Sequence, residues 1–419
     1  MKEKIAVVGA GVIGCAIAHA LAREGRDILL LDRAEPGLGG ASFGNAGHIA
    51  AELVQPLPSR QLLFGFWREL FALDGPLDIP LRRFGTFAPW AWRFAGAAFR
   101  REANTRFLAP LVKSATREFE HLCHKLGRSD LMRRHGHIQV WFGRHAAKKS
   151  AAEASEMDRL DIPTIPASRG LLESIAAAAG AQLIAGLEFP DSGHVLDPLE
   201  VVRALTRGAM QCGAELERAE VRALRPMGDR IALTTESGDR MFDAAVVCAG
   251  PWSAPLLAPF GLRAPLEAAH GYHVELAGHQ PHADAPLIYM DQKVLVTPMA
   301  GRLRASSYME FSGLESLPDP RKPRQLRRKL KDLGYRCESE GPSWRGARPV
   351  LPDYLPGIGR APGSHRLFYA IGHQHLGLTL APVTSELVAD LVAGRQPRHE
   401  LASFDLQRFG KPARKTTSP

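Results

Sequence analysis

The segment 4–33, at the start of the chain, constrains the fold more than any other stretch. A continuous apolar run at 5–8 is typical of a buried parallel strand, apolar residues at helical spacing follow at 12–24, and 28–31 indicate a second buried strand. Between the first strand and the helix stand Gly9, Gly11 and Gly14, in the pattern G-x-G-x-x-G. This order of elements predicts a β-α-β unit in a parallel sheet.

The same unit predicts a dinucleotide site. The three glycines allow a tight turn, close approach of the main chain to a pyrophosphate, and close packing of the helix on the strand. Asp32 ends the second strand, where its carboxylate can accept hydrogen bonds from ribose hydroxyls. The start of the helix offers N–H groups and a partial positive charge to the phosphates. The unit fits NAD and FAD equally well, and a glycine turn without a ligand is the alternative.

The segment after Arg33 favours a flavin. Its sequence, AEPGLGGASFGNAGHIAAELVQPLPSR, is rich in glycine and has neither a helical nor a strand period. A flat ring system lying against the main chain needs small residues, N–H donors and few bulky side chains. An isoalloxazine ring meets that description, although a flexible surface loop has a similar composition.

Ser42, Asn45, Ala46 and Gly47 carry a resemblance to a known family. They match the Ser-x-x-Asn-Ala-Gly segment of the FAD-dependent amine and D-amino-acid oxidoreductases, which the chain resembles. The resemblance implies contacts from this segment to the diphosphate and ring of FAD. Asn45 stands where relatives with a covalent flavin carry histidine, so FAD is expected to bind without a covalent bond; nearby His48 keeps the other case open.

Two internal segments extend the resemblance. GAELERAEVRAL indicates a strand that carries Val221, and DAAVVCAGPWSAPLL indicates a buried strand ending at Gly250, followed by a short helix. The resemblance implies that the main chain at Val221 meets adenine and that Ala249, Gly250 and Trp252 run past the cofactor. Ordinary sheet packing is the alternative, and for Trp252 a place in the core is equally consistent.

A strand, a glycine turn and an amphipathic helix are indicated near the end of the chain. They occupy LFYAIGHQHLGLTLAPVTSELVADLVAG, with the turn at 372–377. The resemblance implies that this helix start faces the N1–C2 carbonyl side of the flavin, where donors stabilise the reduced ring. All these segments together predict FAD contacts at Gly9, Gly11, Ile13, Gly14, Asp32, Arg33, Ser42, Asn45, Ala46, Gly47, Ile49, Val221, Ala249, Gly250, Trp252, His373, Gln374, Leu376, Gly377 and Thr379.

The element GARP is the candidate for substrate recognition. Arg348 lies in it, and prolines at 349, 352 and 356 hold the stretch extended. The resemblance implies that this arginine binds the substrate carboxylate by a two-pronged hydrogen bond, for which a planar guanidinium is suited. Arg345 competes for the role, and a surface arginine is the alternative. The residues predicted to bind substrate are Arg348, Tyr272, Tyr289, Tyr308 and His375, and no catalytic acid or base is expected.

The expected fold class is α/β, with a discontinuous Rossmann-like FAD-binding domain at 1–50, 180–265 and 340–405. A second, α+β substrate domain takes 51–179 and 266–339, and 406–419 form a tail. Helical spacing marks the first of these inserts. Alternating segments around Tyr272, Tyr289 and Tyr308 predict an antiparallel sheet that roofs the flavin. Half-buried packing is the alternative role of these tyrosines.

Cysteine and histidine usage argues against metals and disulfides. The five cysteines include no Cys-x-x-Cys, and His270 and His273 have no carboxylate or cysteine at ligand spacing. Neither a disulfide framework nor a metal is therefore expected, and the cysteine usage suits a reducing compartment.

Charge and aromatic residues bear on location. A net charge of +9 favours anionic partners, such as an acidic substrate or a lipid surface, and no nucleic acid is expected. Without a secretory signal or a long apolar run, the chain is expected in the cytoplasm or peripherally on the inner membrane. A membrane contact would use aromatic and basic residues of the first insert, unless these pack on the core: Trp67, Trp90, Trp92, Arg82, Arg83, Arg93, Arg100 and Arg101.

The resemblance implies oxidation of a D-amino acid. Hydride passes from the α-carbon to flavin N5, and the electrons go on to a quinone or another carrier. The segment GHQHLGLTLAPVTSELVADL is similar to the bacterial D-hydroxyproline dehydrogenases, which favours cis-4-hydroxy-D-proline or D-proline as substrate and a pyrroline carboxylate as product. The alternatives are a broad D-amino-acid dehydrogenase, a glycine- or sarcosine-type oxidase that uses oxygen, a flavin subunit of a multi-chain dehydrogenase, and an NAD-dependent dehydrogenase.

Overall fold

A six-stranded sheet carries the amino-terminal unit in the computed structural model, which describes residues 3–182, 184–337 and 341–410. The three elements expected from the glycine pattern are present: β1 (Lys4–Val8), α1 (Val12–Arg23) and β2 (Asp27–Asp32). The strand order is β10-β2-β1-β14-β21-β20, parallel except for the last pair. The other strands are β10 (Glu215–Arg218), β14 (Ala244–Val247), β21 (Leu367–Ile371) and β20 (Gly357–Arg360).

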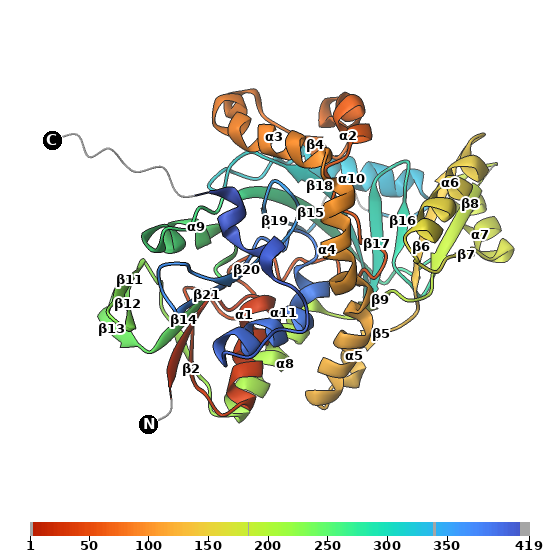
Figure 1. Cartoon of the computed structure of the whole chain (residues 1–419). Helices are drawn as coiled ribbons and strands as arrows, with labels where there is room; N and C mark the ends of the chain where they lie inside the picture. The colour runs from red at the N-terminus through yellow and green to blue at the C-terminus, as the bar shows by residue number, and fades with distance from the viewer. Residues whose placement is uncertain (1–2, 183, 338–340, 411–419) are drawn as a thin grey trace.

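Strand alternation gives this sheet a different core on each face. Ile5 and Val7 pack with the helices α1, α8 (Pro198–Gln211) and α11 (Gly377–Val392), which lie together in Figure 1. Ala6 and Val8 belong to a second cluster, formed with α9 (Ser253–Leu257) and a three-stranded sheet. The strands of that small sheet are β11 (Ala223–Met227), β12 (Arg230–Thr235) and β13 (Gly238–Phe242).

The second large sheet has nine strands and is mostly antiparallel. The predicted strands around Tyr272, Tyr289 and Tyr308 are present in it, and α10 (Arg321–Asp332) covers one of its faces. Its order is β19-β15-β18-β17-β16-β6-β8-β7, with β4 beside β18. The strands are β19 (Ser343–Val350), β15 (Glu267–Ala277), β18 (Arg302–Glu310), β17 (Val294–Met299), β16 (Leu287–Tyr289), β6 (His137–Phe142), β8 (Ile184–Phe189), β7 (Ile165–Pro166) and β4 (Leu77–Asp78).

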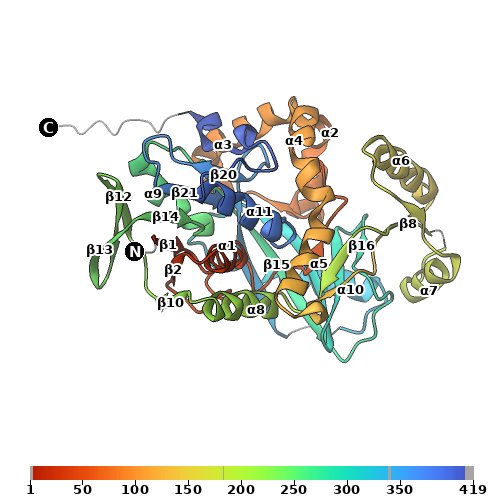
Figure 2. The same ribbon diagram turned by 60° about the horizontal axis from the view of Figure 1, so that its bottom comes forward.

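The helices of the first insert divide between the two parts: α6 and α7 pack on the nine-stranded sheet, whereas α4 and α5 pack on α11. In Figure 2, α6 and α7 stand at the end away from α1, and α2, α3 and α4 lie together. Their bounds are α2 (Arg60–Gly65), α3 (Phe84–Ala98), α4 (Arg101–Lys113), α5 (Ala115–Lys125), α6 (Ala146–Arg159) and α7 (Arg169–Ala179). A third, small sheet has the order β3-β9-β5 and is formed by β3 (His48–Ile49), β9 (Gly193–Val195) and β5 (Met132–Arg133).

Three predicted boundaries need correction. Strand β8, inside the predicted segment 180–265, pairs with β6, and β19, inside 340–405, pairs with β15, so both belong to the nine-stranded sheet. Val221 lies in the loop between β10 and β11 rather than on a strand. Leu406 is fully buried in the core, so the segment 406–409 packs on the body of the protein. The rest of the predicted tail, 411–419, lies outside the described residues.

Candidate FAD and substrate site

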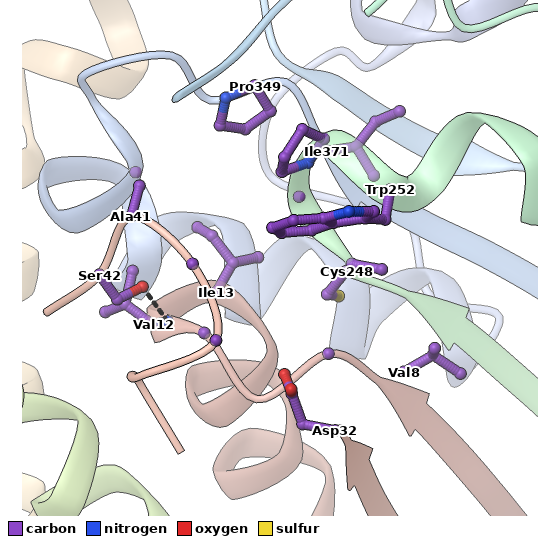
Figure 3. Close-up of a pocket in the computed structure, with 18 of the residues that line it drawn as sticks. Val8, Val12, Ile13, Asp32, Ala41, Ser42, Cys248, Trp252, Pro349 and Ile371 are labelled. Carbon is purple, nitrogen blue, oxygen red and sulfur yellow. Dashed lines mark hydrogen bonds between the residues drawn. The ribbon is translucent and has the colours of Figure 1, made fainter. Parts of the chain in front are cut away.

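The carboxyl ends of β1, β2 and β14 open into a cavity of about 540 Å³ (Figure 3). Its walls come from 8–13, 31–45, 219–222, 248–256, 347–349 and 370–378, so the structure brings together segments from both ends of the chain. Fourteen of the predicted cofactor residues line it: Gly9, Gly11, Ile13, Asp32, Arg33, Ser42, Asn45, Val221, Ala249, Gly250, Trp252, His373, Gln374 and Gly377.

Two glycines of the motif are required by close packing. Gly9 has a φ of +107°, and a Cβ built there would lie 2.5 Å from the carbonyl oxygen of Cys248. A Cβ on Gly14 would lie 1.8 Å from the carbonyl oxygen of Gly9, so α1 touches the turn at that point. Gly14 therefore sets the helix against the strand, as its place in the motif predicts, and does not itself line the cavity.

Ser42 and Asp32 hold the glycine turn in shape. The Ser42 hydroxyl accepts a hydrogen bond from the Val12 amide at 3.0 Å, drawn as a dashed line in Figure 3. The two Asp32 oxygens accept from the Ala10 amide at 2.7 Å and the Ala34 amide at 2.9 Å. A carboxylate oxygen has a second lone pair, so Asp32 keeps acceptor capacity towards a ribose.

Trp252 lies in the cavity and not in the core. Figure 3 shows its indole extending into the open space from the segment after β14. The guanidinium of Arg33 lies over the indole, 4.1 Å from the ring centre. The alternative of core packing for Trp252 is therefore wrong, and a flat aromatic surface is available to a ligand in this cavity.

Several predicted cofactor residues do not line the cavity and lie behind its lining residues. Gly47 has a φ of +75° and approaches Met299 and Val195, so close packing explains it. The side chain of Ile49 is fully buried in the core, and the Thr379 hydroxyl accepts from the Ala50 amide at 3.2 Å. Gly14, Ala46 and Leu376 are likewise absent from the lining of this cavity.

The glycine turn before α11 faces the same cavity, as expected. His373 is buried, its Nε2 lies 3.1 Å from the Thr384 hydroxyl, and burial lowers its pKa to about 3. The side-chain amide of Gln374 donates to the carbonyl of Tyr354. Gly377 and Leu378 begin α11 and line the cavity, so the positive end of that helix points into it.

Arg348 is a partly buried cation beside this cavity. It lies on β19 between the lining residues Ala347 and Pro349. Its guanidinium covers Gly271 of β15, where a Cβ would lie 2.1 Å from Nη2, and it donates to the Tyr308 carbonyl at 3.0 Å. Burial lowers the pKa of the group, and no carboxylate pairs with it within the described part of the chain. Such a cation is poised for an external carboxylate.

His375 and Tyr354 lie next to Arg348. Burial and the charge of Arg348 lower the pKa of His375 to about 4, so its imidazole is neutral at pH 7. The ring of Tyr354 lies 6.3 Å from that of His375, and its φ is +59°. Sequence reasoning missed Tyr354, although its place in the proline-rich stretch after Arg348 was a usable signal.

The three predicted substrate tyrosines are not in this site. Tyr272 donates to Glu310 at 2.5 Å, Tyr308 donates to the Gln325 side chain at 2.7 Å, and Tyr289 lies 3.0 Å from the Tyr335 hydroxyl. All three are buried in the apolar cluster under α10. The strands turn these side chains towards α10 and away from the cavity, so they do not line it.

Arg345 is excluded as a rival to Arg348. Its guanidinium donates to the Ser312 hydroxyl at 2.9 Å and to Ser316, and Nη2 lies 3.7 Å from Glu310. These partners engage both terminal nitrogens of Arg345, whereas its Nε is buried without a hydrogen-bond partner. Arg345 thus packs on the α10 side of the sheet.

Comparisons with known proteins agree with this arrangement. The sequence profile described as FAD dependent oxidoreductase matches residues 4–391. The chain is 31% identical to a D-amino-acid oxidase of Bradyrhizobium diazoefficiens, over 97% of this chain and 98% of that one, and 30% identical to a D-amino acid dehydrogenase of Paramagnetospirillum magneticum, over 97% and 99%.

Solved structures share the fold. Glycine oxidase from Geobacillus kaustophilus superposes with a TM-score of 0.77 at 23% identity, covering 97% of this chain and 99% of that one. L-proline dehydrogenase from P. horikoshii gives a TM-score of 0.71 at 19% identity, covering 97% and 98%. The predicted α/β fold class and the predicted cofactor are therefore confirmed: the chain belongs to the family of FAD-dependent oxidoreductases.

Proposed function

We propose that this protein oxidises a D-amino acid whose carboxylate is bound by Arg348. The observation that carries the proposal is a partly buried guanidinium, packed over Gly271 beside the FAD cavity, that has no carboxylate partner among the described residues. Such a group is costly to bury unless a ligand supplies the counter-charge. The names of the two curated relatives, a D-amino-acid oxidase and a D-amino acid dehydrogenase, favour the same class of substrate.

The lining residues suit FAD by their chemistry. Asp32 would accept from the ribose, the turn at Gly11 and Ile13 with Ser42 would hold the pyrophosphate, and the start of α11 would donate to the flavin ring, all without a covalent bond. When bound, FAD supplies the acceptor for the hydride that leaves the substrate α-carbon.

The residues around Arg348 have three tasks in this reaction. Arg348 binds the carboxylate through two N–H groups and so fixes the orientation of the α-carbon. Its positive charge lowers the pKa of the substrate amine, which must be neutral before hydride can leave. Tyr354 and the neutral His375 cover the site with little competing charge, which keeps water out of it. No general acid or base is required.

For the substrate itself we infer cis-4-hydroxy-D-proline or D-proline, oxidised to a pyrroline carboxylate. The resemblance of the segment from Gly372 to Leu391 supports this choice, and a compact, neutral wall of Tyr354 and His375 suits a small ring. A screen of D-amino acids and proline analogues with an artificial dye acceptor tests it. We expect the highest kcat/KM for the cyclic substrates. A flat profile would instead identify a broad D-amino-acid dehydrogenase, and a preference for glycine or sarcosine would identify an oxidase of that type.

We infer a quinone or another carrier as the electron acceptor. Stopped-flow mixing of the substrate-reduced protein with air-saturated buffer should give slow reoxidation, whereas fast reoxidation with stoichiometric peroxide would show an oxidase. Turnover by a homogeneous single chain in gel filtration would exclude the subunit of a multi-chain complex.

Exposed apolar residues in the first insert support a peripheral membrane contact. No helix among the described residues is long and apolar enough to cross a bilayer. Trp92 is 82% exposed and Leu81 85% exposed. Trp90 does not share this surface, because it is buried against Phe311 and donates to the Val350 carbonyl at 3.3 Å. The exposed residues are Phe64, Phe66, Trp67, Leu73, Leu81, Phe84, Trp92 and Phe99, with exposed Arg68, Arg82 and Arg100 near them in sequence.

Co-sedimentation with vesicles of anionic phospholipid tests this contact. We expect Trp67→Ser with Trp92→Ser to lower the bound fraction at least threefold. The control pair, Met210→Ser with Met227→Ser, removes two other exposed apolar residues, from other elements. Equal binding of both double variants would rule out this surface as the contact.

A further inference from the structure

A second polar cluster lies outside the FAD cavity, where β3 meets β6. His48 and Glu52 come from β3 and the turn after it, and His137 begins β6 of the nine-stranded sheet. Their ligand atoms lie within 4.8 Å of one another. The Nε2 atom of His48 is 3.4 Å from Oε1 of Glu52, and Nε2 of His137 is 3.8 Å from the same oxygen.

All three side chains are buried, and two of their atoms have no hydrogen-bond partner. Glu52 is 4% exposed and His137 2% exposed. Nε2 of His48 and Oε1 of Glu52 are both buried and unpartnered. No lysine or arginine pairs with Glu52 in the part of the chain that the structure describes. A buried carboxylate in this state is costly, and a bound cation would remove the cost.

Outer hydrogen bonds orient two of the three groups, His137 and Glu52, as ligands. Nδ1 of His137 donates to the Pro286 carbonyl at 3.1 Å, which leaves Nε2 with its lone pair towards the cluster. Oε2 of Glu52 accepts from the Ser192 hydroxyl at 2.6 Å, which leaves Oε1 free. Metal-bound histidines and carboxylates commonly have such outer partners.

We propose that His48, Glu52 and His137 bind a divalent transition-metal ion, for which Zn²⁺ is the best match. Two imidazoles and one carboxylate are a ligand set that zinc takes in proteins, with bonds of about 2.0–2.2 Å and a fourth position for water. Tetrahedral bonds of that length put ligand atoms roughly 3.3 Å apart, close to the two separations observed here. The ion ties β3, which follows the FAD-lining segment, to β6 of the other sheet.

Zinc titration of the FAD-loaded, metal-stripped full chain tests the site, with calorimetry for affinity and elemental analysis for stoichiometry. We expect one Zn²⁺ per chain with a Kd at or below roughly 1 µM. Glu52→Gln, which keeps the shape of the side chain, and His137→Gln should each weaken binding at least 100-fold. The control His19→Gln removes another buried histidine, which lies on α1, and should bind zinc like the wild type.

X-ray absorption at the zinc edge provides a second readout that does not depend on activity. We expect nitrogen and oxygen ligands with imidazole scattering. Less than one tenth of an equivalent of zinc on the wild type would overturn the proposal. So would unchanged binding by Glu52→Gln, or a shell of cysteine sulfur at about 2.3 Å. Retained FAD absorbance in each variant shows that the chain is folded.

Discussion

The two faces of the nine-stranded sheet differ in the partners that they give to the arginines of β19. On β15, Tyr272 and Val274 point to the α10 side, whereas Gly271 and His273 point to the other face. The α10 side is closed: Tyr272 donates to Glu310 and also accepts from the Asp319 amide at 2.9 Å. On the opposite face, Gly271 leaves space that the unpaired guanidinium of Arg348 fills.

Arg345 and Arg348 show what this difference means. They lie three positions apart on β19, so strand alternation places them on opposite faces. Arg345 is held by Ser312, Ser316 and Glu310, while Arg348 has a main-chain carbonyl as its one partner among the described residues. Arg345 is therefore anchored by side chains of the protein, whereas Arg348 is available to a ligand.

Two single variants, in which either arginine is replaced by alanine, should differ most in their kinetics and stability. Arg348→Ala should lower kcat/KM roughly 100- to 1000-fold, mainly through KM, because the substrate carboxylate loses its partner. Bound FAD and the melting temperature should stay near the wild type. Arg345→Ala should leave KM within about threefold but lower stability by roughly 1.5–3 kcal/mol. Steady-state kinetics and thermal melts measure both, and an unchanged KM for Arg348→Ala would remove this residue from the site.

Gly271→Ala sharpens the contrast without touching a charge. Its Cβ would stand 2.1 Å from Nη2 of Arg348, so the guanidinium must move. We expect KM to rise about tenfold, equivalent to about 1.4 kcal/mol. Gly170→Ala is the matched control, because that exposed glycine lies on α7 with open space around it. Similar kinetics for both variants would contradict the proposed position of Arg348.

The pH dependence of stability should report on His273, which lies on the face opposite α10. Burial first, and then Arg304, lowers the pKa of His273 to about 4. A lowered folded-state pKa means that the stabilisation is complete above about pH 6.5 and is lost as pH falls towards 4. Its slope is about 1.4 kcal/mol per pH unit for one proton. Between pH 4.5 and 6, His273→Gln should reduce the slope of the unfolding free energy against pH by the amount that corresponds to about one proton. An unchanged slope would show that His273 stays neutral throughout.

Tyr272→Phe should have the smallest effect. The change removes the hydroxyl between Glu310 and the Asp319 amide, so unfolding should become easier by about 1 kcal/mol. KM should remain within about twofold, because the ring faces α10. Chemical denaturation and kinetics on the same preparation check this, and a KM change above tenfold would return Tyr272 to the substrate site.

Local patterns predicted the elements whose signals are local. The β-α-β unit at 4–32 and the strand, turn and helix at 367–392 appear as expected, because apolar period, glycines and helix starts are all encoded within each segment. Gly9 and Gly14 have the packing roles that their motif implies.

Features that depend on distant segments were not predicted. Helix α10, which follows later in the chain, determines which face of β15 is covered. The alternation of Tyr272, Val274 and Leu276 as one apolar face was a usable signal for it. The sheet to which β8 and β19 belong is decided by their pairing with β6 and β15. The group of His48, Glu52 and His137 joins two sheets, so no spacing in the sequence marks it.

The cavity wall runs from Val8 to Leu378, and this has a consequence for biosynthesis. A ribosome must release the chain as far as Leu378 before a complete pocket exists, so the vitamin-derived nucleotide cannot bind to a complete site earlier in synthesis. Because a ligand that binds only the native state stabilises it by mass action, riboflavin supply should govern how much of this protein escapes degradation in the cell.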